Sequence, residues 1–364
     1  MRVDRERFLR FEPCVRLSDL KFFGSTSWTD IDARVSRLLN RDCLGIPSVR
    51  VGMCWALEYL GCNRHHDHVL LPKFIGRCIL NSLNRHALPV EVPTPQTRVV
   101  VVVDQYGLRQ DLDAISAECR RNGYTYFEDS PYGLGHVEER GRGSLARFIG
   151  LTKVLPVVQG AIMVSDDERL IEFVKRKREE QSGWSWTIWT VMALLRCSRE
   201  VGGYSPIADA AYEMYLQGKG GNAWLRGNIL RVLDGVDQIE RVHAERLSLV
   251  GRHLAGRVLM PDLGRVAYVV PYVPGDRLEE AREAFRREGF DANRFHVDVN
   301  RNLFAPRHLK TLLIPVNSRI PTTAFEKLVH RLGKLSSGQH APSAAEPLRL
   351  HETPALGDER KGRI

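Results

Sequence analysis

The chain has 364 residues, of which 43% are hydrophobic, and its formal net charge is +9. This length predicts one large domain and a smaller one, and the apolar runs are too short to span a membrane. The seven cysteines are odd in number and form no CxxC pair, which favours reduced thiols in the cytoplasm over a disulfide framework or a zinc site. The N-terminus is charged with no apolar run behind it, so we expect no signal peptide.

The first predicted helix begins near Ser48 and ends at Gly61. Apolar residues at positions 53, 56, 57 and 60 have helical spacing, serine is a common N-cap, and glycine is a common helix stop. A short strand is predicted at residues 69–72, a helix at 75–83 and another strand at 88–92.

Five consecutive valines at 99–103 predict a strand that is buried on both faces, as in a parallel sheet. A helix follows at 108–122, with Gly123 as its stop, and the next strand is expected at 125–128. This alternation of strands and helices predicts a doubly wound α/β sheet with right-handed crossovers.

The C-terminal half of the chain is mostly helical before it alternates again. A charged helix is predicted at 166–181, with acids first and bases last, and residues 184–255 are mostly helical with a break at 218–222. Strands at 266–270 and 312–316, with helices at 277–288 and 323–335, predict a small α/β domain. We therefore expect a large domain at 1–255 with an N-terminal arm at 1–40, a small domain at 256–336 and a disordered tail at 337–364.

Asp129 and Lys153 are the side chains that most strongly suggest a function. Each follows a short apolar run and enters a turn. An amine and a carboxylate at strand ends of one α/β domain can hold the two ends of pyridoxal phosphate (PLP), the amine through the aldehyde and the carboxylate through the protonated pyridine nitrogen. Taken singly, Asp129 is explained by a turn cap and Lys153 by a solvated surface charge.

Three other features of the sequence allow more than one interpretation. The histidine cluster at 64–68 could ligate a metal, but no distant Cys or His has ligand spacing, so we interpret it as a solvated turn with no metal. Trp184, Trp186 and Trp189 suit a buried helix start or a dimer contact, with substrate stacking as the alternative. The basic charge suits an anionic small substrate better than nucleic acid, because no nucleic-acid-binding motif accompanies it.

From about residue 40 to about residue 335, the chain resembles the DegT/DnrJ/EryC1/StrS family of PLP-dependent aminotransferases. The stretches that carry this resemblance are residues 48–61, 103–115, 127–132, 151–161, 221–225 and 314–317. The resemblance implies the type I fold of PLP-dependent transferases, with a mostly parallel central sheet in the large domain and a small C-terminal α/β domain.

The same resemblance implies roles for individual residues. Lys153 would be the Schiff-base residue and Asp129 the partner of the pyridine nitrogen. The other implied cofactor-binding residues are Ser48, Val49 and Arg50 at a phosphate-binding helix start, Phe74 and Gly76 near the ring-stacking position, Tyr132 after the aspartate, Gly150 at a phosphate contact, and Asn222 reaching the neighbouring subunit.

The function implied is transfer of an amino group from an amino acid donor to a keto sugar carried on a nucleotide, in polysaccharide or secondary-metabolite biosynthesis. The resemblance also implies a homodimer with its sites at the subunit boundary. The alternative is a PLP-binding relative that has lost transamination and has another catalytic or regulatory role. Gly76, Gly150 and Trp224 keep that alternative open, because the family has other residue types at these positions.

Overall fold

A computed structural model describes residue 15 and residues 26–131, 133–134, 143–180, 187, 190–191, 223–262 and 266–336. The predictions made for Tyr132, Asn222, the tryptophans at 184, 186 and 189, the break at 218–222 and the tail at 337–364 lie outside these residues.

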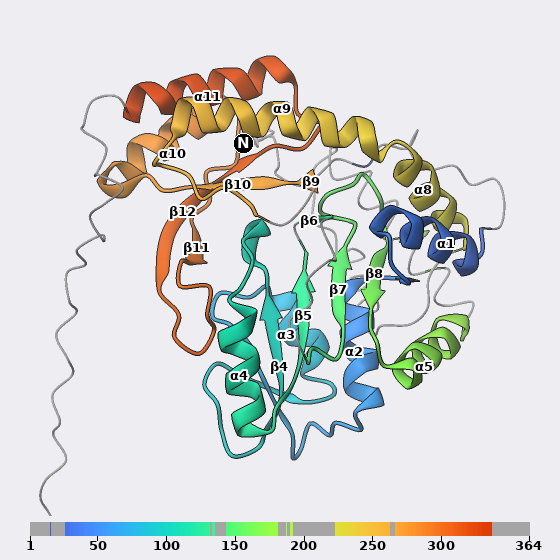
Figure 1. Cartoon of the computed structure of the whole chain (residues 1–364). Helices are drawn as coiled ribbons and strands as arrows, with labels where there is room; N and C mark the ends of the chain where they lie inside the picture. The colour runs from blue at the N-terminus through green and yellow to red at the C-terminus, as the bar shows by residue number, and fades with distance from the viewer. Residues whose placement is uncertain are drawn as a thin grey trace, which may run out of the picture.

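The larger of the sheets has seven strands in the order β1-β8-β7-β5-β4-β2-β3 (Figure 1). The strands are β1 (Leu44–Ile46), β2 (His68–Leu70), β3 (Leu88–Val90), β4 (Thr97–Val103), β5 (Thr125–Ser130), β7 (Arg147–Gly150) and β8 (Ala161–Val164). The five strands β3, β2, β4, β5 and β7, which are adjacent in this order, pair in parallel. Strand β8 runs antiparallel to both β7 and β1. The predicted mostly parallel α/β sheet is confirmed.

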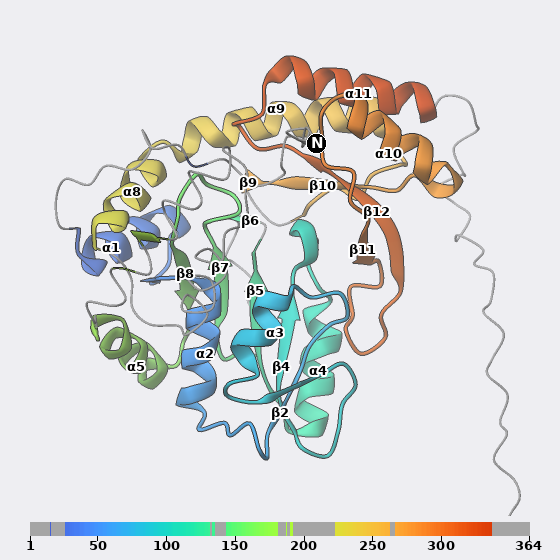
Figure 2. The ribbon, with the colours of Figure 1, turned by 180° about the vertical axis from the view of Figure 1, so that it is seen from behind.

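Helices cover both faces of this sheet. Helix α4 (Leu112–Asn122) lies in front of it in Figure 1, and α2 (Val49–Tyr59) and α3 (Arg77–Leu83) lie behind it, as Figure 2 shows from the other side. Along β4, Val99 and Val101 pack in the core with α2, whereas Val100 and Val102 pack with α4. The valine run is continuous because each face of the strand meets apolar side chains.

The predicted starts and stops of the helices are mostly confirmed. Ser48 caps α2, and Gly123 ends α4 with a left-handed φ of 71°. Helix α5 (Glu168–Glu179) begins after Asp167, whose side chain accepts a hydrogen bond from Leu170 N. Helix α4 begins at Leu112 rather than at residue 108, because the preceding segment forms a 3₁₀ turn, η2 (Gln105–Gly107), before the Asp111 cap.

The predicted N-terminal arm contains a helix that the sequence analysis did not identify. Helix α1 (Trp28–Leu39) begins with a capping box in which the side chains of Ser27 and Asp30 each accept the other residue's backbone N–H. Its buried face shares a core with α8 (Ala223–Asp234) and with the strands β7 and β8. The last part of the arm is therefore part of the folded core.

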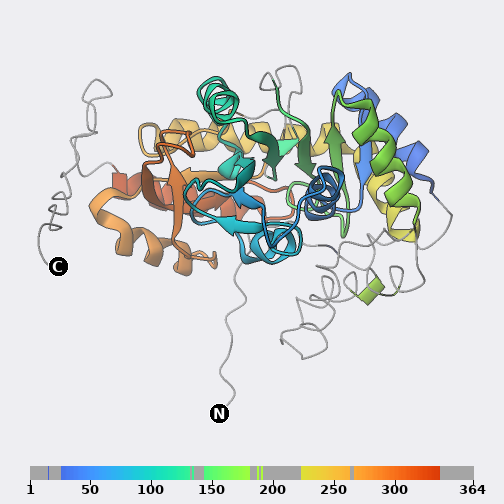
Figure 3. The same ribbon diagram turned by 90° about the horizontal axis from the view of Figure 1, so that it is seen from below.

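A three-stranded antiparallel sheet in the order β10-β12-β11 lies to one side of the large sheet (Figures 1 and 3). Its strands are β10 (Val269–Tyr272), β11 (Phe295–Asp298) and β12 (His308–Pro315), and its helices are α9 (Val236–Leu254), α10 (Leu278–Arg287) and α11 (Thr322–Ser336). The short 3₁₀ turn η3 (Gly275–Arg277) precedes α10, and β6 (Gly133–Leu134) pairs with β9 (Val266–Ala267). The predicted strands and helices of this part are confirmed, and β11 was missed.

Helix α9 ends against the small sheet. Val250 and Leu254 are buried in the same core as β10, β12, α10 and α11. The division into domains at residue 255 stays a prediction. Within the described ranges, none of the helices is both long enough and apolar enough to cross a membrane.

Candidate active site

The ends of β4, β5 and β7 lie side by side at the carboxyl edge of the large sheet. Val103, Asp129 and Phe148 are register partners across these three parallel strands. Lys153 lies in the turn that follows β7. Ligands of open α/β sheets bind at the carboxyl ends of the strands, so the topology brings the two predicted residues to such an edge.

The Asp129 side chain is buried, with 3% of its surface exposed. Among the residues that the structure describes, its Oδ1 atom has no hydrogen-bond partner. Burial raises the pKa of Asp129 to about 7; the nearby charges of Lys153 and Arg50 lower it, and that of Asp104 raises it. A buried carboxylate oxygen without a donor is costly unless a ligand supplies one, so Asp129 has the properties of a ligand-binding group.

Lys153 is presented by a turn whose other residues are anchored in the core. Leu155 N donates to Leu151 O at 2.8 Å, and Leu151 N donates to Gly160 O at 3.2 Å. Leu151 and Leu155 are fully buried, whereas Lys153 is half-buried. The turn therefore fixes the backbone of Lys153 while its amine stays near the Asp129 carboxylate, whose pKa it lowers.

The start of α2 lies against the same strand ends. The Ser48 side chain accepts a hydrogen bond from Val51 N at 3.3 Å, and Gly160 N donates to Pro47 O at 2.7 Å. The loop after Lys153 is thus tied to the residue that precedes the helix cap. Backbone N–H groups in the first turn of a helix lack intrahelical acceptors and attract an anion. The phosphate-binding roles of Ser48, Val49 and Arg50 stay predictions.

Gly150 ends β7 beside Pro131, which follows β5, and Val49, which begins α2. A Cβ atom at this position would lie 3.2 Å from Pro131 Cα and 3.5 Å from Val49 Cγ2. A contact of 3.2 Å to backbone is tight, so a larger residue would require Pro131 to shift. The phosphate contact at Gly150 stays a prediction, and without a side chain this residue can offer only its backbone for it.

Phe74 and Gly76 are placed differently from the residues above. The ring of Phe74 stacks on His296 at a centroid distance of 4.0 Å and meets the edge of His308 at 5.0 Å. Gly76 is exposed and is the N-cap of α3. The contacts described for Phe74 lead to the small sheet and not to Asp129 or Lys153, and the cofactor roles of Phe74 and Gly76 stay predictions.

Residues 64–66 form a turn that Asp67 closes by accepting a hydrogen bond from Asn63 N at 2.7 Å. His68 instead begins β2, is half-buried, and its Nδ1 atom lies 2.7 Å from Thr94 Oγ1. Across the part of the chain that the structure describes, no group of three or more His, Cys, Asp and Glu side chains is placed to hold a metal ion. In the same part of the chain, five cysteines are free thiols.

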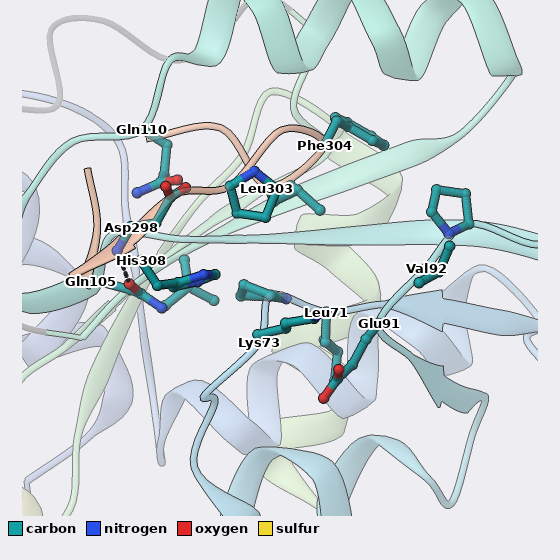
Figure 4. A pocket seen from close by; sticks show the side chains of 14 residues that line it. Leu71, Lys73, Glu91, Val92, Gln105, Gln110, Asp298, Leu303, Phe304 and His308 are labelled. Carbon is teal, nitrogen blue, oxygen red and sulfur yellow. Dashed lines mark hydrogen bonds between the residues drawn. The ribbon is translucent and has the colours of Figure 1, made fainter. Parts of the chain in front are cut away.

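A cavity of about 240 Å³ opens next to this edge, between the carboxyl ends of β2, β3 and β4 and the loop that joins β11 to β12 (Figure 4). Its polar lining includes Lys73, Glu91, Gln105, Gln110 and His308. None of these residues has a role predicted from the sequence. Gln105 and Gln110 lie in the stretch 103–115 that supports the family resemblance, which is the only signal that points to any of them.

The loop over the cavity is organised by one carboxylate. Asp298 accepts hydrogen bonds from the backbone N–H groups of Asn300, Asn302 and Arg307, at 3.0, 2.9 and 2.8 Å. The backbone N–H of Asp298 in turn donates to Gln105 Oε1 at 3.1 Å, the bond drawn dashed in Figure 4. This bond fixes the β11–β12 loop to the end of β4.

No protein-family model matches the sequence. Among solved structures, the chain is similar to DesI, determined in the presence of its TDP-sugar product, with 16% identity and a TM-score of 0.61 over 92% of this chain and 94% of that one. It is similar to the putative sugar aminotransferase Spr1654 from Streptococcus pneumoniae in its PMP form, with 12% identity and a TM-score of 0.61 over 91% and 98% of the two chains. The chain has the sugar-aminotransferase fold.

Helicobacter pylori PseC, an aminotransferase involved in the biosynthesis of pseudoaminic acid, shares this fold with 13% identity and a TM-score of 0.58 over 90% of this chain and 99% of that one. The sugar-aminotransferase fold is the type I fold of PLP-dependent transferases that the sequence motifs imply. At these identities the similarity establishes the fold, and the reaction is argued from the residues of the site.

Proposed function

We propose that the protein binds PLP and transfers an amino group from an amino acid donor to a keto sugar carried on a nucleotide. The observation that carries this proposal is the buried Asp129 carboxylate at the carboxyl edge of the sheet. Its Oδ1 atom has no hydrogen-bond partner among the described residues, and the charge of Lys153 lies nearby. The residues present fit the cofactor, because each of its three polar ends has a counterpart.

Asp129 would pair with the pyridine nitrogen, Lys153 would hold the aldehyde carbon, and the start of α2 with Gly150 would receive the phosphate. When bound, PLP supplies an electron sink for the carbanion that forms at the α-carbon of the amino acid. Asp129 has the task of keeping a proton on the pyridine nitrogen. Burial raises the pKa of this carboxylate, and the charges of Lys153 and Arg50 offset only part of that rise by favouring the ionised form.

Lys153 Nζ has the task of moving a proton. As a neutral amine, it would accept the proton from the α-carbon of the amino acid donor and later release it. The anchored turn at Leu151 and Leu155 keeps the amine in place for both transfers.

The substrate class is supported by the similar structures and by charge. DesI was determined with a TDP-sugar product, and PseC takes part in the biosynthesis of pseudoaminic acid. The net charge of +9 suits an anionic nucleotide-linked substrate. Polysaccharide or secondary-metabolite biosynthesis in the cytoplasm is the setting that we propose.

Labelling of Lys153 tests the cofactor assignment directly. We expect that borohydride reduction of the protein with PLP, followed by peptide mapping, places the phosphopyridoxyl group on Lys153. The Lys175→Ala variant, which removes an exposed lysine of α5, should label as the wild type does. A label on another lysine, or no label, would contradict the assignment. If Lys153 is labelled but no amino acid converts the cofactor to its pyridoxamine form, the chain is a PLP-binding protein without transamination.

The assembly is proposed to be a homodimer. The support is the resemblance of Asn222 to a residue that contacts the neighbouring subunit's cofactor, together with the tryptophan-rich segment before it. Sedimentation of the PLP-bound protein should give twice the chain mass. A monomer at the same concentration with PLP bound would rule out a cross-subunit contact.

A further inference from the structure

Arg147 is a fully buried arginine on the face of the large sheet opposite to Asp129. Only 1% of its surface is exposed. Side chains alternate between faces along a strand, so Glu128 and Ser130 share the face of Arg147, while Asp129 points to the face of α2. Glu128 and Arg147 are register partners on β5 and β7.

The guanidinium group of Arg147 connects the two residues that flank Asp129. Its Nε atom donates to Ser130 Oγ at 3.0 Å and lies 3.9 Å from Glu128 Oε2. Its Nη2 atom lies 3.8 Å from Asp104 Oδ2, an oxygen that also accepts a hydrogen bond from Ser130 Oγ. Asp104 N then donates to the carbonyl oxygen of Asp129 at 2.9 Å.

These contacts fix the end of β5 from the face of the sheet opposite to the Asp129 side chain. A buried arginine is tolerated only when carboxylates and acceptors compensate its charge, and here they come from the ends of β4 and β5. On the other face, Asp129 Oδ1 has no hydrogen bond from the described residues, and Pro131 after β5 has no N–H to extend the strand pairing. The orientation of Asp129 therefore depends on the backbone that Arg147 fixes.

We propose that Arg147 is a positioning residue for Asp129, holding the end of β5 so that the Asp129 carboxylate faces the cofactor ring. This inference rests on the proposed function. It predicts that the effects of changing Arg147 on cofactor binding disappear once Asp129 can no longer bind the ring.

The test is a double-mutant cycle on the binding of pyridoxamine 5'-phosphate, which cannot form a bond with Lys153 and so reports the non-covalent contacts. Asp129→Asn should raise the Kd about tenfold or more, and Arg147→Met should raise it about tenfold. The double variant should be no weaker than Asp129→Asn alone, because both changes remove the same contact. Arg147→Lys should recover part of the loss, since it keeps the charge but lacks the Nε donor that bonds Ser130 Oγ.

Arg178→Met is the matched control. Arg178 is also a buried arginine, 4% exposed, and it pairs with Asp32 Oδ2 at 2.6 Å away from the site. Its replacement should lower the free energy of unfolding but leave the Kd of the folded protein unchanged. If Arg147→Met does not fold, Ser130→Ala can replace it, because this change removes the hydroxyl that joins Arg147 to Asp104. The double-mutant cycle with Asp129→Asn is then measured in the same way.

Two results would overturn the inference: a folded Arg147→Met protein with the wild-type Kd, or effects of Arg147→Met and Asp129→Asn that add. Failure of the wild-type protein to bind pyridoxamine 5'-phosphate is a different result and would overturn the proposed function itself.

Discussion

Replacing Asp129 with asparagine is expected to stabilise the unliganded protein while weakening its binding of PLP by about ten- to hundredfold. The loss of affinity follows because asparagine cannot pair as an anion with a protonated pyridine nitrogen. The gain in stability follows because the buried carboxylate is poorly compensated in the absence of a ligand.

The pH dependence of unfolding identifies the cause of that gain. The pKa of Asp129 is raised from its usual 3.8 to about 7, so between these values the unfolded chain has lost the proton that the folded protein still holds. The free energy of unfolding therefore falls as the pH rises through this window and stays low above it. A pKa shift of this size lowers the free energy of unfolding of the wild-type protein by at most about 4 kcal/mol at high pH. The asparagine variant does not suffer this loss, because its side chain does not titrate.

Chemical denaturation of the unliganded wild-type and Asp129→Asn proteins at pH 5 and pH 8 would measure this effect. We expect the variant to be the more stable protein at pH 8, with a smaller difference at pH 5. A slope with pH should remain in the variant, because burial also raises the pKa of Glu128 to about 7. An Asp129→Asn protein that is less stable at pH 8, or that binds PLP as tightly as the wild type, would contradict the role given to this carboxylate.

Replacing Lys153 with alanine is expected to reduce the rate at which an amino acid donor converts the cofactor by about 10² to 10⁴-fold or more. That range is the usual contribution of a positioned general acid or base, and the variant also loses the covalent link to the cofactor. The conversion of PLP to its pyridoxamine form, followed by absorbance in single-turnover experiments, measures this rate.

Lys175→Ala should react at the wild-type rate and serves as the control, because Lys175 is an exposed residue of α5 that pairs with Glu172. The affinity of the Lys153→Ala protein for pyridoxamine 5'-phosphate should fall much less than its rate. A Lys153→Ala protein that converts the cofactor as fast as the control would require a different base.

The elements that the sequence predicts well are those whose signals are local. The valine run of β4, the Ser48 cap of α2 and the glycine after α4 each depend on the preferences of a few neighbouring residues. Asp129 and Lys153 were identifiable because each follows an apolar strand run, and the parallel topology then brings the strand ends together.

The parts that the sequence did not predict depend on contacts between distant segments. The start of α4 shifts because η2 contains Tyr106 in a left-handed conformation with a φ of 56°. The pairing of Arg147 with Asp104 and Glu128 depends on the register between β4, β5 and β7, which local patterns do not specify. Phe74 lies near the position where an aromatic residue is expected, which Gly76 occupies, but its ring packs on His296 and His308 of the small sheet.

The stacking of Phe74 on His296 also connects two parts of the molecule mechanically. Phe74 lies in the segment between β2 and α3, has a left-handed φ of 61° and is 54% exposed, whereas His296 belongs to β11. A rotation of the small sheet must either carry this segment with it or separate the two rings. Aromatic pairs contribute only about 0.5–1.5 kcal/mol, so the contact would guide such a rotation without blocking it. The width of the cavity entrance would then change with the angle between the two sheets.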